Sequence, residues 1–127
     1  MAVETPSGFY PRPAPIEAYG DGGFRFAGMS HRGSILVLPS GVHAWTAASD
    51  LGLSLQSLAP VLAERDRLDI VLLGTGEGQI FPDPAVSLAF ETAGLALEAM
   101  STGAAARTFN VLLAEGRRVA AALLAIP

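Results

Sequence analysis

Cysteine and lysine are both missing from this sequence of 127 residues. Without cysteine the chain can form no disulfide bond, thiolate nucleophile or cysteine-ligated zinc site. All eight basic residues are therefore arginines, and twelve acidic residues give a net charge of −4. Only Arg117 and Arg118 are adjacent to each other. Because nucleic-acid binding requires clustered positive charge, this pattern argues against a nucleic-acid-binding protein.

Charged residues of either sign are scarce, at 16% of the chain, compared with about 25% in ordinary soluble proteins. Half of the residues are hydrophobic, enough for a sizeable core in a single domain of this length. So little charge suggests that protein partners cover part of the surface, and a homo-oligomer is one such arrangement.

Long hydrophobic runs are absent as well. The uncharged stretch at 119–127 is shorter than the roughly 20 residues that span a bilayer. Residues 1–15 lack the continuous apolar core of a signal peptide. We therefore expect a cytoplasmic protein with no transmembrane segment.

Regular structure is predicted only from residue 16 onward. Residues 1–15 hold four of the nine prolines and are predicted to be a flexible arm, with Phe9 and Tyr10 as its only anchors. Apolar residues then predict strands at 16–19, 24–28 and 34–38. Short polar turns at 20–23 and 30–33 separate these strands, which favours an antiparallel hairpin.

The second half alternates between strands and helices. Strands are predicted at 69–74, 95–100 and 118–126, and helices from about 54 or 57 to 65, from 83 to 93 and from 101 to 115. Three strand–helix–strand units imply right-handed crossovers and mainly parallel pairing. The predicted fold class is α/β: a single three-layer domain at 16–127, with helices on both faces of a mixed central sheet that includes the hairpin.

Two loops combine glycine with hydroxyl side chains at the carboxyl ends of predicted parallel strands, where ligands collect in open α/β sheets. The second loop also opens a helix whose first amides are free and partly positive. Such features can hold a phosphate or carboxylate. A purely structural role is the favoured explanation of both loops, since glycine is common at strand ends and the helix needs an N-cap. The candidate ligand-binding residues are Gly74, Thr75, Gly76, Ser101, Thr102, Gly103 and Arg107.

Gly74 should mark the point where a strand ends and the chain turns sharply. A positive φ at this position would require glycine. Trp45 follows a turn at 39–41 and is expected either to fill the edge of the core or to anchor an interface.

Other residues lack a pattern that indicates chemistry. His31 and His43 lie in two predicted loops, with no third ligand at metal-binding spacing. No nucleophile elbow surrounds a serine, and no pair of carboxylates is fixed by short spacing. The glycine loops match neither a P-loop nor a dinucleotide fingerprint. We therefore predict no catalytic residue, cofactor or metal site.

Several motifs in a fixed order resemble one family. They are Tyr19–Phe26 (YGDGGFRF), Gly33–Pro39 (GSILVLP), Leu73–Gly76 (LGTG), Met100–Leu112 (MSTGAAARTFNVL) and Glu115–Val119 (EGRRV). Together they resemble the Mth-type domain family of unknown function, over about residues 16–126. Its eukaryotic members include the mitochondrial complex I assembly factor 3 and an adipogenesis-associated protein.

The resemblance implies a three-layer α/β domain with a mixed sheet. It also implies an accessory or assembly role that acts through protein partners. These partners would belong either to a respiratory complex or to the protein-export machinery, because some bacterial members are encoded beside export genes. The family has no established catalytic residues to carry over. The Pro-rich start has no mitochondrial presequence and fits a bacterial member. The leading hypothesis is thus a non-catalytic assembly protein. The alternative is a domain, either a binding domain or an enzyme, that binds a small anion or a nucleotide at the two glycine loops.

Overall fold

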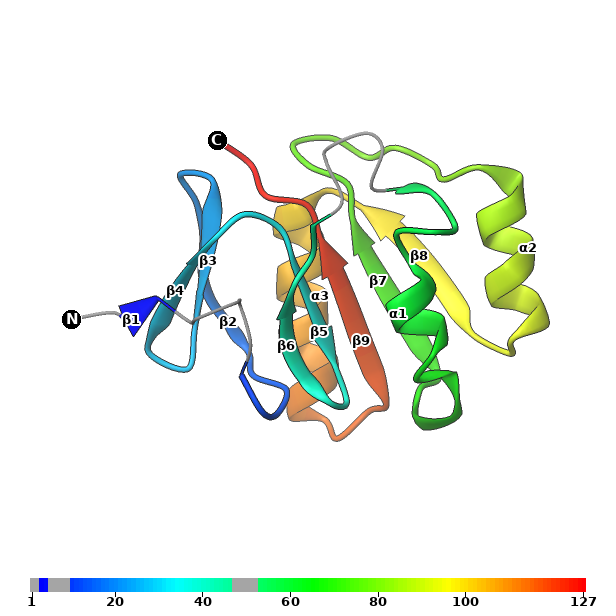
Figure 1. Ribbon diagram of the computed structural model, residues 1–127, viewed down its shortest axis with the longest axis horizontal. Helices are drawn as coiled ribbons and strands as arrows, with labels where there is room; N and C mark the ends of the chain where they lie inside the picture. The colour runs from blue at the N-terminus through cyan, green and yellow to red at the C-terminus, as the bar shows by residue number, and fades with distance from the viewer. Residues whose placement is uncertain (1–2, 5–9, 47–52) are drawn as a thin grey trace.

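The computed structural model describes residues 3–4, 10–46 and 53–127, which form two sheets and three α-helices (Figure 1). The smaller sheet has the strand order β1-β4-β3-β2, and the larger has the order β6-β5-β9-β7-β8. In chain order the elements are β1 (Val3–Glu4), β2 (Ile16–Gly20), β3 (Gly23–Phe26), β4 (Met29–Arg32), β5 (Ile35–Leu38), β6 (Gly41–Ala44), α1 (Ala59–Leu62), a 3₁₀ turn (Arg65–Arg67), β7 (Ile70–Gly74), α2 (Pro84–Thr92), β8 (Ala96–Met100), α3 (Thr102–Ala114) and β9 (Val119–Leu123).

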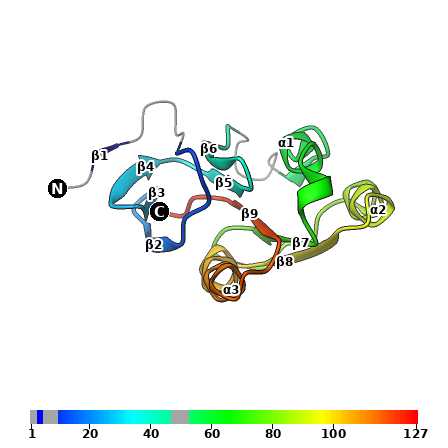
Figure 2. The ribbon, with the colours of Figure 1, turned by 90° about the horizontal axis from the view of Figure 1, so that it is seen from below.

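The five-stranded sheet is the central layer of the domain. β7 pairs in parallel with both β8 and β9, whereas β5 runs antiparallel to β9 and β6. Helices α1 and α2 lie on one face and α3 on the other (Figure 2). Phe90 of α2 and Phe109 of α3 are fully buried in the two separate core clusters that result. The mixed sheet with a helical layer on each face confirms the predicted α/β fold, but β2 and β3 lie in the smaller sheet and not in the central one as predicted.

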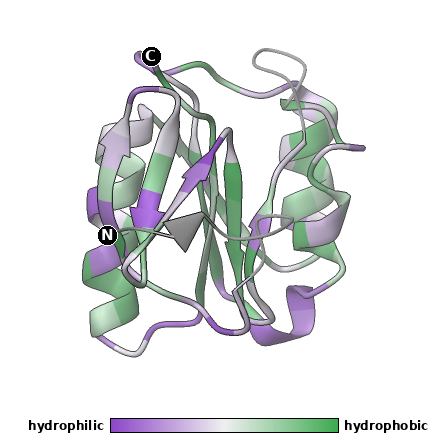
Figure 3. Cartoon of the chain, turned by 60° about the vertical axis from the view of Figure 1, so that its left-hand side comes forward, coloured by the Kyte–Doolittle hydropathy of each residue, from purple (hydrophilic) through white to green (hydrophobic). Residues whose placement is uncertain are grey.

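Hydrophobic residues concentrate on the central strands, as Figure 3 shows by colour. β5 and β9 are buried along their whole length, because both of their faces are covered by other layers. Trp45 is also buried, and its indole Nε1 donates to the Ser57 carbonyl at 2.9 Å. Of the two roles expected for Trp45, the structure therefore shows the core-filling one.

The first predicted strand–helix–strand unit differs from the other two. β9 lies between β5 and β7, and β5 runs antiparallel to both. β5 is followed by the antiparallel strand β6, so the parallel crossover through α1 runs from β6 to β7 and not from β5 as predicted. The α1 helix is also shorter than predicted, and Pro60 falls in its first turn, where its missing amide costs nothing.

The smaller sheet packs beside α3 and begins with the expected hairpin of β2 and β3. Its inner face carries Phe24 and Phe26, which are buried in the same core cluster as Phe109. Residues 29–32 form β4, although residues 30–33 were predicted to be a turn. The prediction was wrong because this strand is polar (MSHR) and borders solvent, so it lacks the apolar alternation that marks a half-buried strand.

Asn110 of α3 fixes the smaller sheet to the rest of the domain. Its Oδ1 accepts the Ile16 amide and its Nδ2 donates to the Ile16 carbonyl, both at 2.8 Å. One side chain thus pairs both backbone groups at the start of β2. Among the described residues, no helix is both long and apolar enough to cross a membrane.

The last part of the predicted arm makes defined contacts with the domain. Tyr10 pairs with Val42 through two backbone hydrogen bonds of 2.8 Å. Its ring meets Phe26 edge-on at a centroid distance of 6.3 Å, and Ala14 is buried. Phe9, the other expected anchor, lies outside the described residues.

Truncation tests the predicted boundary between the arm and the domain. We expect a chain that starts at residue 9 to keep most of the stability, because it loses only the two-residue pairing of β1 with β4 and Tyr10 remains. A chain that starts at residue 13 should lose about 1–2 kcal/mol, because it lacks the Tyr10 pairing. Urea denaturation of the two truncated chains measures the difference. Equal stabilities would favour a free arm that extends to residue 15.

Candidate functional site

The structure brings the two predicted glycine loops together at the carboxyl ends of β7 and β8. Gly76 donates its amide to Thr102 Oγ1 at 3.0 Å and accepts the Thr102 amide at 2.8 Å. Thr75 donates its amide to the Met100 carbonyl at 2.9 Å. Six of the seven candidate residues, Gly74 to Gly76 and Ser101 to Gly103, therefore lie at one edge of the sheet, as predicted.

The two threonine hydroxyls of this edge are used inside the protein. Thr102 is fully buried, and its Oγ1 donates to the Leu124 carbonyl at 2.7 Å while it accepts the Gly76 amide. Thr75 Oγ1 lies 2.6 Å from the Gly78 carbonyl and accepts the Ile80 amide at 3.0 Å. Both hydroxyls hold the loops to neighbouring segments.

The start of α3 is capped and partly covered. Ser101 is the N-cap, and its side chain accepts the Ala104 amide at 3.4 Å. The Tyr19 hydroxyl lies so close to Gly103 that a Cβ there would overlap it. Arg107 is exposed on α3 and takes part in neither of the two ion pairs found among the described residues. A ligand role for these residues stays a prediction.

Gly74 does not have the positive φ that was expected. The positive value belongs to Gly76 instead, at 101°. Gly74 is the last residue of β7, and a Cβ there would lie 2.9 Å from Leu123 Cδ2 and 3.0 Å from Thr102 Cα. Glycine is required here because α3 approaches closely.

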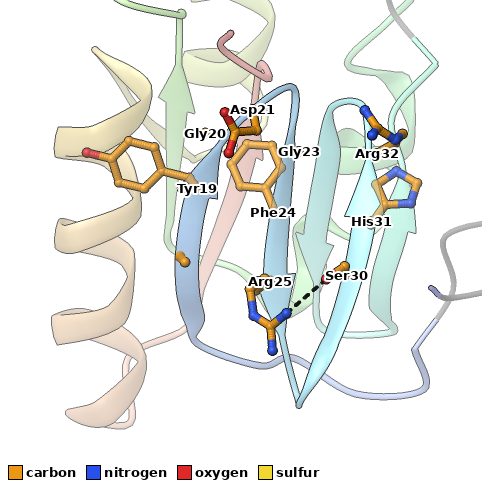
Figure 4. A pocket seen from close by; sticks show the side chains of 10 residues that line it. Tyr19, Gly20, Asp21, Gly23, Phe24, Arg25, Ser30, His31 and Arg32 are labelled. Atoms are coloured by element: carbon orange, nitrogen blue, oxygen red, sulfur yellow. Dashed lines mark hydrogen bonds between the residues drawn. The ribbon is translucent and has the colours of Figure 1, made fainter. Parts of the chain in front are cut away.

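A shallow groove of about 380 Å³ lies over the smaller sheet (Figure 4), and it is lined by none of the seven candidate residues of the glycine loops. The strand register sets Arg25 opposite Ser30 and Arg32 opposite Gly23. Residues two apart on a strand share a face, so both arginines project from the same face. Sequence reasoning missed this site because residues 29–32 were not recognised as a strand. The lining residues are Ala18, Tyr19, Gly20, Asp21, Gly23, Phe24, Arg25, Ser30, His31 and Arg32.

A second cluster joins a serine, a histidine and a glutamate at the opposite edge of the central sheet. Ser40 Oγ lies 2.5 Å from Glu64 Oε2 and 2.8 Å from His43 Nε2, and the Ser40 amide donates to Glu64 Oε1 at 2.9 Å. The Ser40 hydroxyl donates to Glu64, and its oxygen also lies within hydrogen-bond distance of His43. The network ties the β5–β6 turn to the end of α1.

Both histidines lie on strands, His31 on β4 and His43 on β6, and not in loops as expected. Across the residues that the structure describes, no group of three or more His, Cys, Asp or Glu side chains could hold a metal ion.

Comparison with known proteins places the chain in a family. The family model described as "protein of unknown function (DUF498/DUF598)" matches residues 16–124. The chain belongs to this family. The match confirms the resemblance seen in the ordered motifs, of which the first, Tyr19–Phe26, supplies six of the ten residues that line the groove.

Two relatives of this chain are an uncharacterised bacterial protein and a mouse protein that is named as an assembly factor. An uncharacterised protein of Rhodobacter capsulatus is 42% identical over 113 residues, which cover 89% of this chain and 86% of that protein. Mouse NADH dehydrogenase (ubiquinone) 1 alpha subcomplex assembly factor 3 is 32% identical over 118 residues. That alignment covers 93% of this chain and 64% of the mouse protein, so the chain spans less than two thirds of the mouse factor.

Solved structures agree with the DUF498/DUF598 assignment. A Bartonella henselae protein described as an outer membrane protein has a TM-score of 0.86 and 44% identity, over 93% of this chain and 99% of that one. A Bordetella pertussis protein described as an Mth938-like domain has a TM-score of 0.73 and 33% identity, over 87% of this chain and 85% of that one. The chain therefore has the Mth938-like fold.

Proposed function

We propose that this protein is a non-catalytic accessory factor that assists the assembly of a membrane-associated complex by binding a protein partner. The first candidate is a respiratory complex of the complex I type. The proposal is supported by a relative, the mouse assembly factor, whose name states that role. It is also supported by an exposed apolar segment of this chain, described next.

The exposed apolar segment consists of Ile80, Phe81 and Leu88, in the loop that leaves β7 and in α2. Phe81 is 76% exposed, Leu88 is 62% exposed and Ile80 is 51% exposed. Six large hydrophobic side chains are exposed in the described part of the chain, and these three fall within nine residues. Single exposed apolar residues are ordinary, but a group of them indicates a protein interface. Aromatic anchors such as Phe81 are typical of such interfaces.

Complementation in the native bacterium tests this function. We expect deletion of the gene to lower the amount of assembled complex I on native gels, and the wild-type gene to restore it. A double variant, Ile80→Ser with Phe81→Ser, should restore much less, because losing two anchors weakens an interface by roughly tenfold or more. Val111→Ser is the matched control, since Val111 is 57% exposed on α3 outside the segment. Its complementation should equal that of the wild type.

Two results would contradict the proposal: unchanged membrane complexes in the deletion strain, or full restoration by the double variant. A photocrosslinking residue at position 81 then identifies the partner class. A link to a complex I subunit supports the respiratory assignment, a link to an export component moves the role to export, and a link to a second copy indicates a homo-oligomer. Cell fractionation in the same strain tests the cytoplasmic location that belongs to this proposal.

A further inference from the structure

We propose that the groove over β2, β3 and β4 is a binding site for a small organic anion that carries carboxylate or phosphate groups. The groove lies on a different part of the chain from the exposed apolar segment. This inference therefore does not depend on the assembly function. Four features of the groove support it: its charge, its floor, its rigidity and its size.

The charge of the groove comes from Arg25 and Arg32. The register places them diagonally on the same face, a separation of about 7–8 Å at the backbone that long side chains can bridge. Arg25 Nη1 donates to Ser30 Oγ at 3.2 Å, which holds its guanidinium beside β4 (Figure 4). The two ion pairs found among the described side chains involve Arg67 and Arg118 and neither groove arginine.

The floor of the groove is made of residues with little or no side chain. Ala18 lies opposite Arg25, and Gly20 lies opposite Gly23, on the face that carries the two arginines. A Cβ at Gly23 would overlap the His31 carbonyl oxygen, so no side chain fits there. The result is a hollow over bare backbone that is bordered by two cationic side chains.

The end of the groove is held in place by the turn between β2 and β3. Gly22 donates its amide to the Ile126 carbonyl at 2.7 Å, and its own carbonyl accepts the Gly33 amide at 2.7 Å. These bonds tie the turn to the C-terminal segment and to the start of β5. A site that is already ordered loses little conformational entropy when a ligand binds.

The size and the third charge of the groove define the ligand class. A volume of about 380 Å³ falls in the range of small-molecule sites, roughly 300–1,000 Å³, and exceeds what one inorganic phosphate fills. Arginine binds carboxylate and phosphate oxygens in a bidentate geometry. The Asp21 carboxylate lines one end and would repel a long polyanion there. We therefore expect a compact phosphorylated or polycarboxylated molecule.

Calorimetric titration of the full chain at constant ionic strength tests this site. The probes are inorganic phosphate, citrate and ADP, with a polyglutamate peptide as a fourth. We expect saturable binding of citrate or ADP and weaker binding of phosphate. Arg25→Gln and Arg32→Gln should each weaken the affinity about tenfold or more, as for loss of a charged hydrogen bond. Arg117→Gln, an exposed arginine outside the groove, should leave it unchanged.

A variant that keeps the charge tests the role of the floor. Ala18→Leu places a larger side chain in the groove at an exposed position. It should therefore lower the affinity for citrate and ADP and leave the affinity for phosphate unchanged. Melting temperatures of all variants control for folding. The proposal is overturned if no probe binds saturably, if polyglutamate binds more tightly than every small anion, or if binding survives both groove variants. Loss of binding in Arg107→Gln alone would instead place the anion at the glycine loops.

Discussion

The Gly74→Val variant is expected to unfold with a free energy about 2–4 kcal/mol lower than the wild type. A Cβ at position 74 would lie 2.9 Å from Leu123 Cδ2, 3.0 Å from Thr102 Cα and 3.1 Å from Thr102 Oγ1. Leu123 can shift its side chain, but Thr102 Cα belongs to the first turn of α3 and cannot move without the helix. Valine adds two further methyl groups to this contact, so β7 and α3 must separate.

Gly78→Val is the matched control for this prediction. Gly78 lies in the same loop, and a Cβ there would meet no atom within 4 Å. We expect its stability to stay within about 0.5 kcal/mol of the wild type, as for surface substitutions away from special features. Urea denaturation compares the two variants. If both unfold at the same urea concentration, the close approach of α3 does not constrain position 74.

Gly74 also shows what a sequence pattern can and cannot predict about a glycine. The end of an apolar run at DIVLLG correctly predicts where the strand ends, because this signal is local. The reason for glycine is not local, since it depends on Thr102, which lies 28 positions further along the chain. A positive φ and a close approach of another segment both require glycine, so the sequence shows the same residue in either case.

The elements of the fold also separate into those that a local sequence signal predicts and those that depend on distant residues. β7, β8, β9 and the helices α2 and α3 were predictable because apolar periodicity and helix caps mark each of them. The position of β9 between β5 and β7 was not predictable, because it depends on pairing between residues 84 to 88 positions apart, such as Val37 with Ala121 and Ile35 with Leu123. β4 carries no apolar alternation, so its partners in the smaller sheet determine its conformation.

The candidate sites also differ in whether a local motif or a long-range contact forms them. The glycine loops could be predicted because each is a short motif directly after a strand. The groove could not, since Arg25 and Arg32 come together only through the register of β3 and β4. Ser40 and Glu64 are 24 residues apart and meet only where α1 packs against the β5–β6 turn. Residue types that are unremarkable in sequence became a site or a network through contacts that no local pattern encodes.

The Thr102→Val variant should lose about 2–4 kcal/mol of unfolding free energy, although valine has almost the same shape as threonine. The lost hydroxyl leaves the Gly76 amide without its acceptor and the Leu124 carbonyl without its donor, and each buried unpaired group costs about 1–3 kcal/mol. Thr102→Ser keeps the hydroxyl and should cost less. Thr108→Val is the control on the same helix, because Thr108 bonds only weakly, to Met100 Sδ at 3.8 Å. Denaturation curves of the three variants give the comparison.

The result also decides between the two roles that the sequence left open for the loop pair. If Thr102 joins β7, α3 and the C-terminal segment, its hydroxyl acts only on stability, and anion titrations of Thr102→Val below its melting point should match those of the wild type. If instead the hydroxyl serves a ligand, the variant should be nearly as stable as Thr108→Val and should lose its response to phosphate or ADP. Because Thr102 is fully buried with both hydrogen bonds made inside the chain, we expect the first outcome. A stable variant without an anion response would restore the glycine loops as the binding site.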